Sequence, residues 1–178
     1  METVFIVGFY GAGSKMIAKL LASRKNLNYI DISDKVSEKE KKEKIDIIND
    51  NGTEYYKSVE KYVLNNSIEQ GSIVSIDEDM VLDEDMRHII KRIGRVFYLK
   101  AKPETLYNNL LENHDYVKKL KDNFSIFTIT NMLNEYENYY NELRNYVINI
   151  DDKNINEILR ETLAWYNYIH KFKCHIYM

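Results

Sequence analysis

The stretch that decides the fold is Gly8-Phe9-Tyr10-Gly11-Ala12-Gly13-Ser14-Lys15-Met16, near the start of a chain of 178 residues. A short apolar run precedes it over residues 3–7, as expected of a buried parallel strand. Apolar residues after it recur on one face of a helix that runs to about Ser23. A strand, a glycine-rich turn and a helix start form an anion site, because backbone N–H groups point inward and the helix dipole adds positive charge.

The stretch departs from the phosphate-binding pattern G-x-x-x-x-G-K-[ST] at two positions. Gly8 and Gly13 keep the spacing, but Ser14 stands where the lysine belongs and Lys15 where the hydroxyl belongs. In the usual pattern the lysine bridges the β- and γ-phosphates, and the hydroxyl ligates Mg²⁺. Moving a lysine one place along a helix turns its stem by about 100°. We therefore expect Lys15 to point beside bound phosphates rather than at them.

The candidate nucleotide- or phosphate-binding residues are those of the loop and of the first helical turn. Their backbone N–H groups supply the cradle, and two side chains add a hydroxyl and a charge. They are Gly8, Gly11, Ala12, Gly13, Ser14, Lys15 and Met16. The alternative is a strand-to-helix turn that merely needs glycine. The flanking strand and helix favour the phosphate-binding interpretation.

The composition is that of an ordinary globular domain, with 44% hydrophobic and 30% charged residues. A net charge of -3 lacks the basic excess that is typical of nucleic-acid-binding domains. The single cysteine, Cys174, excludes an internal disulfide framework and fits a reducing compartment. No apolar run approaches the roughly 18 residues that a membrane-spanning helix needs. We expect a cytoplasmic protein that binds neither nucleic acid nor membrane.

Strands and helices alternate along the rest of the chain. The apolar patterns predict strands over residues 3–7, 29–32, 71–76, 95–99 and 146–150, and helices over about 16–23, 36–51, 53–64, 83–93, 104–112, 129–144 and 155–172. This alternation is typical of an α/β protein, here a three-layer α/β/α arrangement around a five-stranded parallel sheet. Since the sequence contains no repeat and no linker, we expect one domain over residues 1–178.

With the second strand included, the sequence resembles the shikimate kinases. Their N-terminus typically reads I-x-L-I-G-F-M-G-A-G-K-S-T, followed by F-I-D-x-D, and this chain reads IVGFYGAGSKM over 6–16 and YIDISD over 29–34. The segment GTEYYKSVEKYVL over 52–64 resembles G-E-x-x-F-R-x-x-E-x-x-x-L, and RVFYLKAKPETLYNNLLEN over 95–113 resembles V-V-Y-L-x-x-x-P-E-x-L-x-x-R-L. The likeness runs in order from about Val4 to about Leu163.

The resemblance implies the P-loop NTPase fold of the nucleoside-monophosphate-kinase type. It also implies a substrate-binding helical region over about 34–62 and a lid over about 112–128. Members of the family transfer the γ-phosphoryl group of ATP to the 3-hydroxyl of shikimate in aromatic amino-acid biosynthesis. If this chain is active, its cofactors are therefore ATP and Mg²⁺.

The D-x-D motif of the family bears on the metal site. Its first carboxylate serves the metal, and Asp31 matches that position, so the resemblance makes Asp31 and Lys15 the candidate catalytic residues. Ser33 stands in the place of the second carboxylate, and Asp34 follows one position late. Asp77 ends an apolar strand and could hold Mg²⁺ together with Asp31 in a rewired site. The alternative for Asp77 is a solvent-facing acidic turn.

Several substrate-binding positions of the family carry other residues here. The arginine that binds the shikimate carboxylate in the family is replaced by Lys57, which keeps the charge but cannot form the bidentate hydrogen bonds of a guanidinium group. A triple glycine becomes three carboxylates, which would repel an anionic acid, and the late arginine of R-x-P-x-Y aligns with Tyr136. The candidate substrate-binding residues are Ser33, Asp34, Lys57, Asp77, Glu78, Asp79 and Tyr136.

The lid region has no arginine to bring over the phosphates, because none occurs between Arg95 and Arg144. Its cations are Lys118, Lys119 and Lys121, which a solvated helix face explains equally well. An arginine supplied to the transferring group can be worth about 10³–10⁵ in rate. We therefore favour a shikimate-kinase-like protein that has lost most or all of its catalysis and retains nucleotide or phosphate binding.

Two alternatives stay open, and with them the question whether the protein is an enzyme. One is an active small-molecule kinase, either slow on shikimate or rewired to a neutral or cationic acceptor. The other is a structural or regulatory module without a ligand. The C-terminal helix is rich in large apolar side chains, which favour a homodimer or a protein partner. They are Trp165, Tyr166, Tyr168, Ile169 and Phe172.

Overall fold

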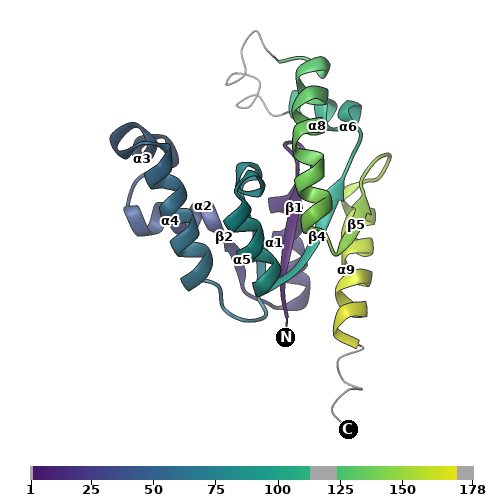
Figure 1. Ribbon diagram of the computed structural model, residues 1–178. Helices are drawn as coiled ribbons and strands as arrows, with labels where there is room; N and C mark the ends of the chain where they lie inside the picture. Colours follow the sequence, from purple (N-terminus) through teal and green to yellow (C-terminus); the bar gives the residue numbers. More distant parts are fainter. Residues whose placement is uncertain (1, 113–123, 172–178) are drawn as a thin grey trace.

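Five strands form one parallel sheet in a computed structural model that describes residues 2–112 and 124–171 (Figure 1). The strand order is β2-β3-β1-β4-β5, and every neighbouring pair is parallel. The strands are β1 (Thr3–Gly8), β2 (Tyr29–Asp31), β3 (Ile73–Ser75), β4 (Gly94–Lys100) and β5 (Tyr146–Asn149). The predicted α/β class with a five-stranded parallel sheet is confirmed.

Helices cover both faces of this sheet. They are α1 (Ser14–Lys25), α2 (Ile32–Glu40), α3 (Lys44–Asn51), α4 (Thr53–Asn66), α5 (Glu84–Ile93), α6 (Pro103–Leu111), α8 (Ile126–Leu143) and α9 (Ile155–Lys171), with a 3₁₀ helix η1 (Glu78–Leu82). Helix α1 packs against β1, β3 and α9, whereas α5 packs against β4, α4 and α8. From β1 the chain continues first to one side of the sheet and then to the other. Because the crossovers between parallel strands are right-handed, their helices fall on opposite faces, and the sheet is the middle layer of three.

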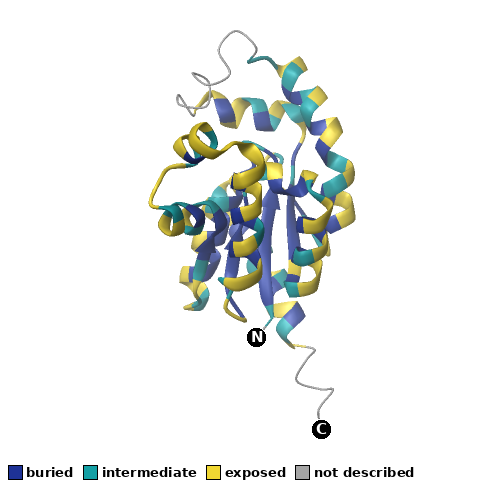
Figure 2. Cartoon of the chain, turned by 60° about the vertical axis from the view of Figure 1, so that its left-hand side comes forward, coloured by how far each residue is buried: buried dark blue, intermediate teal, exposed yellow. Residues whose placement is uncertain are grey.

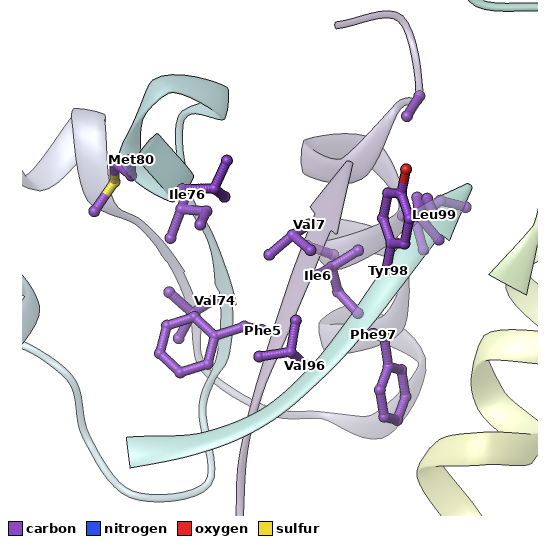
Figure 3. Close-up of a cluster of buried hydrophobic side chains, with 14 of the residues drawn as sticks. Phe5, Ile6, Val7, Val74, Ile76, Met80, Val96, Phe97, Tyr98 and Leu99 are labelled. Atoms are coloured by element: carbon purple, nitrogen blue, oxygen red, sulfur yellow. The ribbon is translucent and has the colours of Figure 1, made fainter. Parts of the chain in front are cut away.

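The core lies between these layers and is centred on the middle strand. Every residue of β1 is buried, and Figure 2 shows the strands as a buried centre inside helices whose outer faces are exposed. Phe5 and Val74 lie on neighbouring strands in the apolar cluster of Figure 3, beside Val96 of β4. Burying one such side chain stabilises the fold by about 1.5–3 kcal/mol, so the strand that carries the glycine loop is firmly anchored in the core.

The strand order brings three functional segments to one edge of the sheet. Strands β2, β3 and β1 are neighbours, with Asp31 beside Ser75 and Ser75 beside Ile6 in the register. Because all three run in the same direction, the glycine loop, Asp31 and the segment after β3 meet at the carboxyl edge. Ligands of open α/β sheets bind at this edge.

Two local features differ from the expectations. Residues 36–51 were expected to form one helix, but α2 ends at Lys41, whose left-handed backbone (φ 55°) cannot continue it. The chain between Asp77 and Asp83 forms η1, which apolar periodicity did not reveal. The expected lid over about 112–128 lies mostly outside the described residues, as do Lys118, Lys119 and Lys121. Across 2–112 and 124–171, no helix is long and apolar enough to cross a membrane.

Candidate functional site

The loop between β1 and α1 has the backbone of a phosphate-binding turn. Gly11 and Gly13 have φ values of 84° and 75°, in the region that favours glycine. A Cβ atom at Gly11 would lie 2.8 Å from the carbonyl oxygen of Leu106, so a larger residue does not fit there. Gly13 is the N-cap of α1 and offers no side-chain hydrogen bond. The first N–H groups of α1 therefore remain available to an anion.

A cavity of about 760 Å³, here called the loop cavity, lies against this turn. Residues 11–17 line it together with Glu78, α6 and the segment from Ile150 to Ile158. The Asn109 amide donates a hydrogen bond of 2.9 Å to the Gly11 carbonyl oxygen and so ties the loop to α6. Gly8 lies at the base of the loop, where its carbonyl oxygen accepts a hydrogen bond from Tyr140. The volume suits a small-molecule ligand.

The Lys15 ammonium lies between two carboxylates. Its Nζ atom is 3.0 Å from Asp77 Oδ1 and 3.2 Å from Asp31 Oδ2. It also donates a hydrogen bond of 2.9 Å to Ser33 Oγ. The side chain of Lys15 is 44% exposed, whereas that of Asp31 is 3% exposed. Lys15 therefore bridges the ends of β2 and β3 from the first turn of α1.

Asp31 is held as a carboxylate by donors on both oxygens. Oδ1 accepts from the backbone N–H and the hydroxyl of Ser33, and Oδ2 accepts from Tyr29 and Ser75. Burial would raise the pKa of Asp31, but the Ser33 hydrogen bonds and the Lys15 charge hold it below its usual value. The side chain also caps α2, so it fixes the local structure as well as the charge.

Asp77 is not the solvent-facing turn that was the alternative for it, because its side chain is only 14% exposed. Its second oxygen forms an ion pair of 3.0 Å with Lys44. Burial would raise the pKa of Asp77, but the Lys15 and Lys44 charges hold it below its usual value. We call the five residues Lys15, Asp31, Ser33, Lys44 and Asp77 the Lys15 cluster.

The charges of the Lys15 cluster balance without a divalent ion, since two carboxylates face two ammonium groups. All four carboxylate oxygens already accept from a donor. Mg²⁺ requires near-octahedral oxygen ligands at about 2.0–2.1 Å, and the Lys15 ammonium takes the position between Asp31 and Asp77. Across 2–112 and 124–171, no group of three or more His, Cys, Asp or Glu side chains could hold a metal ion. As arranged, these residues do not fit Mg²⁺.

Asp79 connects the loop to α8 through two tyrosines. Its Oδ1 atom accepts hydrogen bonds from the hydroxyls of Tyr10, at 2.7 Å, and Tyr136, at 2.9 Å. Burial and the Asp79 carboxylate raise the pKa of both tyrosines, so both hydroxyls stay protonated. Phe9 packs edge-on against the same two rings. Tyr136, which was expected to take the place of a family arginine, thus binds a carboxylate of the chain itself.

A second cavity, of about 600 Å³, lies between α3, α4, η1 and the start of α5, and we call it the helical cavity. Two predicted substrate-binding residues, Lys57 and Asp79, line it. The other predicted substrate-binding residues do not line it. Ser33 and Asp77 belong to the Lys15 cluster, and Glu78 lines the loop cavity. Asp34 is exposed in the first turn of α2, and Tyr136 donates a hydrogen bond to Asp79.

Sequence reasoning did not single out Lys44, Tyr10, Tyr56 or Glu60. Lys44 stands in a charged run that reads as a solvated helix, and Tyr10 occupies a variable position of the loop pattern. Glu60 matches a glutamate of the family pattern, which is the one signal that could have marked it. The positions of these four residues in the site depend on contacts between α3, α4 and the loop. The spacing of residues within one helix or strand does not reveal contacts between different elements.

Comparison with known proteins supports one family. A family model described as shikimate kinase matches residues 10–167. A shikimate kinase of a Sulfurihydrogenibium species is 29% identical over 165 residues, which cover 92% of this chain and 97% of that protein. The crystal structure of shikimate kinase from Bacteroides thetaiotaomicron superposes with a TM-score of 0.80 at 17% identity, covering 96% of this chain and 98% of that one.

A second solved structure shows the same fold. Shikimate kinase from Acinetobacter baumannii in complex with shikimate has a TM-score of 0.80 at 18% identity, with 97% of this chain and 95% of that chain covered. At these identities the likeness of the structures concerns the fold alone. Together with the strand order, it confirms the expected P-loop kinase architecture.

Proposed function

The chain belongs to the shikimate kinase family, and from that premise we propose that it binds a nucleotide or phosphate at its glycine loop but transfers the phosphoryl group slowly or not at all. Family membership implies ATP, Mg²⁺ and shikimate for an active member. The proposal of reduced transfer rests on how this chain fills the corresponding positions.

The position of Lys15 carries the proposal. Phosphoryl transfer depends on cations that neutralise the charge spreading over the transferring group. Here the ammonium of the loop is engaged by Asp31 and Asp77, at 3.2 and 3.0 Å. This pairing supports the proposal that the ammonium contributes little charge to bound phosphates, and it leaves no room for a metal ion between Asp31 and Asp77. The exchange of Ser14 and Lys15 would therefore remove both the charge of the loop lysine and that of the metal ion from the transferring phosphoryl group.

The acceptor side supports the same conclusion. The Lys57 ammonium pairs with Glu54 at 3.3 Å, an exposed contact with which a ligand carboxylate would have to compete. Asp79 presents a negative charge to the helical cavity, and Tyr136 donates to that charge. Shikimate is an anion, so these groups disfavour it relative to an uncharged ligand.

The test is turnover with shikimate and ATP in excess Mg²⁺, measured as ADP release beside the Sulfurihydrogenibium enzyme. We expect a kcat/KM at least about 10³ lower than that of the comparison enzyme. The double variant Ser14→Lys, Lys15→Ser restores the usual order of the loop and should recover part of the difference. Wild-type turnover within about tenfold of the comparison enzyme would contradict the proposal.

A second candidate function is an active kinase with a different, non-anionic acceptor. The acidic lining of the helical cavity favours it, because that lining repels anions and tolerates neutral or cationic alcohols. ADP release in a screen of neutral and cationic alcohols with ATP and Mg²⁺ tests it. Turnover of any such alcohol above the rate of ATP hydrolysis alone supports this function, and no turnover across the screen rejects it.

A further inference from the structure

The helical cavity contains a buried carboxylate without an ion pair. Glu60 of α4 lines the cavity, is 5% exposed, and forms no ion pair within residues 2–112 and 124–171. The buried Tyr56 hydroxyl lines the same cavity; it interacts with the Glu60 carboxyl group and has no other hydrogen-bond partner among the described residues. Buried polar groups in native proteins are normally satisfied by protein, water or ligand. This pair, which has no ion-pair partner, therefore points to a ligand in the cavity.

Asp79 adds a second negative charge to the lining. Its Oδ1 atom accepts hydrogen bonds from Tyr10 and Tyr136. Both donors are neutral hydroxyls, so they orient the carboxylate but do not compensate its charge. Three further acids, Asp83, Glu84 and Asp85, line the cavity where α5 begins. Among these three, Asp83 caps α5 and Asp85 pairs with Lys61, so the argument rests on Glu60 and Asp79.

The two lysines of the lining are already engaged by other carboxylates. Lys44 pairs with Asp77 at 3.0 Å, and Lys57 pairs with Glu54 at 3.3 Å. Both partners lie outside the cavity lining. Each lysine is thus paired outside the lining, which leaves Asp79 as a charged acid of the cavity and Glu60 as an acid that ionises near pH 8.

We propose that the helical cavity binds a small molecule that carries a positively charged amine, with Glu60 and Asp79 as its counter-ions and the Tyr56 hydroxyl as a hydrogen-bond partner. The inference rests on and deepens the second candidate function, which assigns the acceptor to this cavity. Binding itself requires neither a nucleotide nor phosphoryl transfer.

The titration of Glu60 agrees with this assignment. Burial, aided by Asp77 and Asp79 and opposed by Lys44, raises the pKa of Glu60 to about 8. The Lys44 charge therefore compensates Glu60 only in part. An ammonium group in the cavity would supply one, whereas a carboxylate ligand would add a further negative charge.

The test compares three ligands of one shape and three charges. We would titrate the full chain, without nucleotide at pH 8, with 3-aminocyclohexanol, 1,3-cyclohexanediol and 3-hydroxycyclohexanecarboxylate. Binding is followed by amide chemical shifts of α3, α4 and η1. The amine should bind about tenfold tighter than the diol or more, and the carboxylate weakest. A carboxylate that binds as tightly as the amine, or an amine that causes no shift in these segments, would overturn the proposal.

Two conservative variants locate the charge. Asp79→Asn and Glu60→Gln keep the side-chain shape, and each should weaken amine binding by about threefold to tenfold and diol binding by less. Glu38→Gln removes an exposed acid of α2 and serves as the matched control. Thermal melts show whether each variant is folded. Equal amine affinity in all three variants would reject the proposed counter-ions, and none of these outcomes depends on whether the loop binds nucleotide.

Discussion

At the scale of single residues, the exchange of Ser14 and Lys15 changes what the first turn of α1 can do. A lysine at the earlier position is the one that the phosphate-binding pattern aims at the anion. At the later position its ammonium lies within 3.2 Å of two carboxylates from neighbouring strands. The loop keeps the backbone N–H groups that can bind an anion, but its lysine side chain forms ion pairs with Asp31 and Asp77.

Replacing Lys15 with threonine should create a metal site. The Lys15→Thr variant restores a hydroxyl at this position and removes the ammonium between Asp31 and Asp77, so Mn²⁺ can take that position with one oxygen ligand from each of the three residues. We expect Mn²⁺ binding in the variant at least about tenfold tighter than in the wild type, measured by electron paramagnetic resonance. Lys19→Thr, in the same helix but exposed, is the control and should bind as the wild type does. Equal Mn²⁺ affinity in the wild type and Lys15→Thr would contradict the assignment of the Lys15 cluster.

Glu60 should make the stability of the protein depend on pH. Its pKa is raised from about 4.3 in an unfolded chain to about 8 in the fold. Between these values the folded state holds a proton that the unfolded state has lost, so stability is greatest below pH 4.3 and falls as pH rises to 8. Glu60→Gln should raise the free energy of unfolding at pH 8 by about 1–3 kcal/mol and change it little at pH 5.

Urea denaturation of both proteins at pH 5 and pH 8 measures this difference. Burial also raises the pKa of Glu78 to about 7, but that contribution is common to both proteins and cancels in the comparison. If Glu60→Gln is no more stable than the wild type at pH 8, Glu60 has its counter-charge within the chain, and the reasoning about the helical cavity loses its support.

Part of this site could be predicted from the sequence. Patterns within single segments marked the loop glycines, Asp31 and Asp77 as candidates, and the direction of Lys15 relative to bound phosphates stays a prediction from helix geometry. The partners of Lys15 could not be predicted, because Ser33 and Asp77 are brought to it by strand order. Lys44 was missed for the same reason, since its ion pair with Asp77 joins residues 33 positions apart.

At the scale of elements, the break between α2 and α3 shapes the helical cavity, because α3 supplies Lys44 and Ile48 to its lining. The break depends on Lys41, which adopts the left-handed conformation (φ 55°). The sequence offers no glycine or proline there, so apolar periodicity alone predicted one helix over 36–51. Tertiary packing of two short amphipathic helices outweighed the local preference to continue.

Lys41→Gly should therefore stabilise the protein. Glycine adopts positive φ without the Cβ clash, so we expect an increase of about 0.5–1 kcal/mol in the free energy of unfolding. Glu38→Gly, in the interior of α2, should instead lower it by about 1 kcal/mol. Urea denaturation of the two variants measures both values. A loss of stability in Lys41→Gly would show that α2 does not end at this residue.

At the scale of the whole molecule, the alternation of strands and helices was enough to predict the parallel sheet and its two helical layers. The strand order was not predicted, and it gathers the loop, β2 and β3 at one edge. The homodimer or partner surface on α9 stays a prediction. Tyr166 and Ile169 of that helix are buried within the chain, whereas Tyr168 is 51% exposed, and Phe172 lies outside the described residues.

The most direct test of the account is a calorimetric titration of the wild-type protein with ATP, once in excess MgCl₂ and once in excess EDTA. If the Lys15 ammonium takes the place of the metal, ATP binds in both conditions with dissociation constants within about threefold of each other. Lys15→Thr, measured beside it, should bind more tightly with Mg²⁺ than without. A wild-type affinity that rises about tenfold or more with Mg²⁺, or no binding of ATP in either condition, would contradict the account.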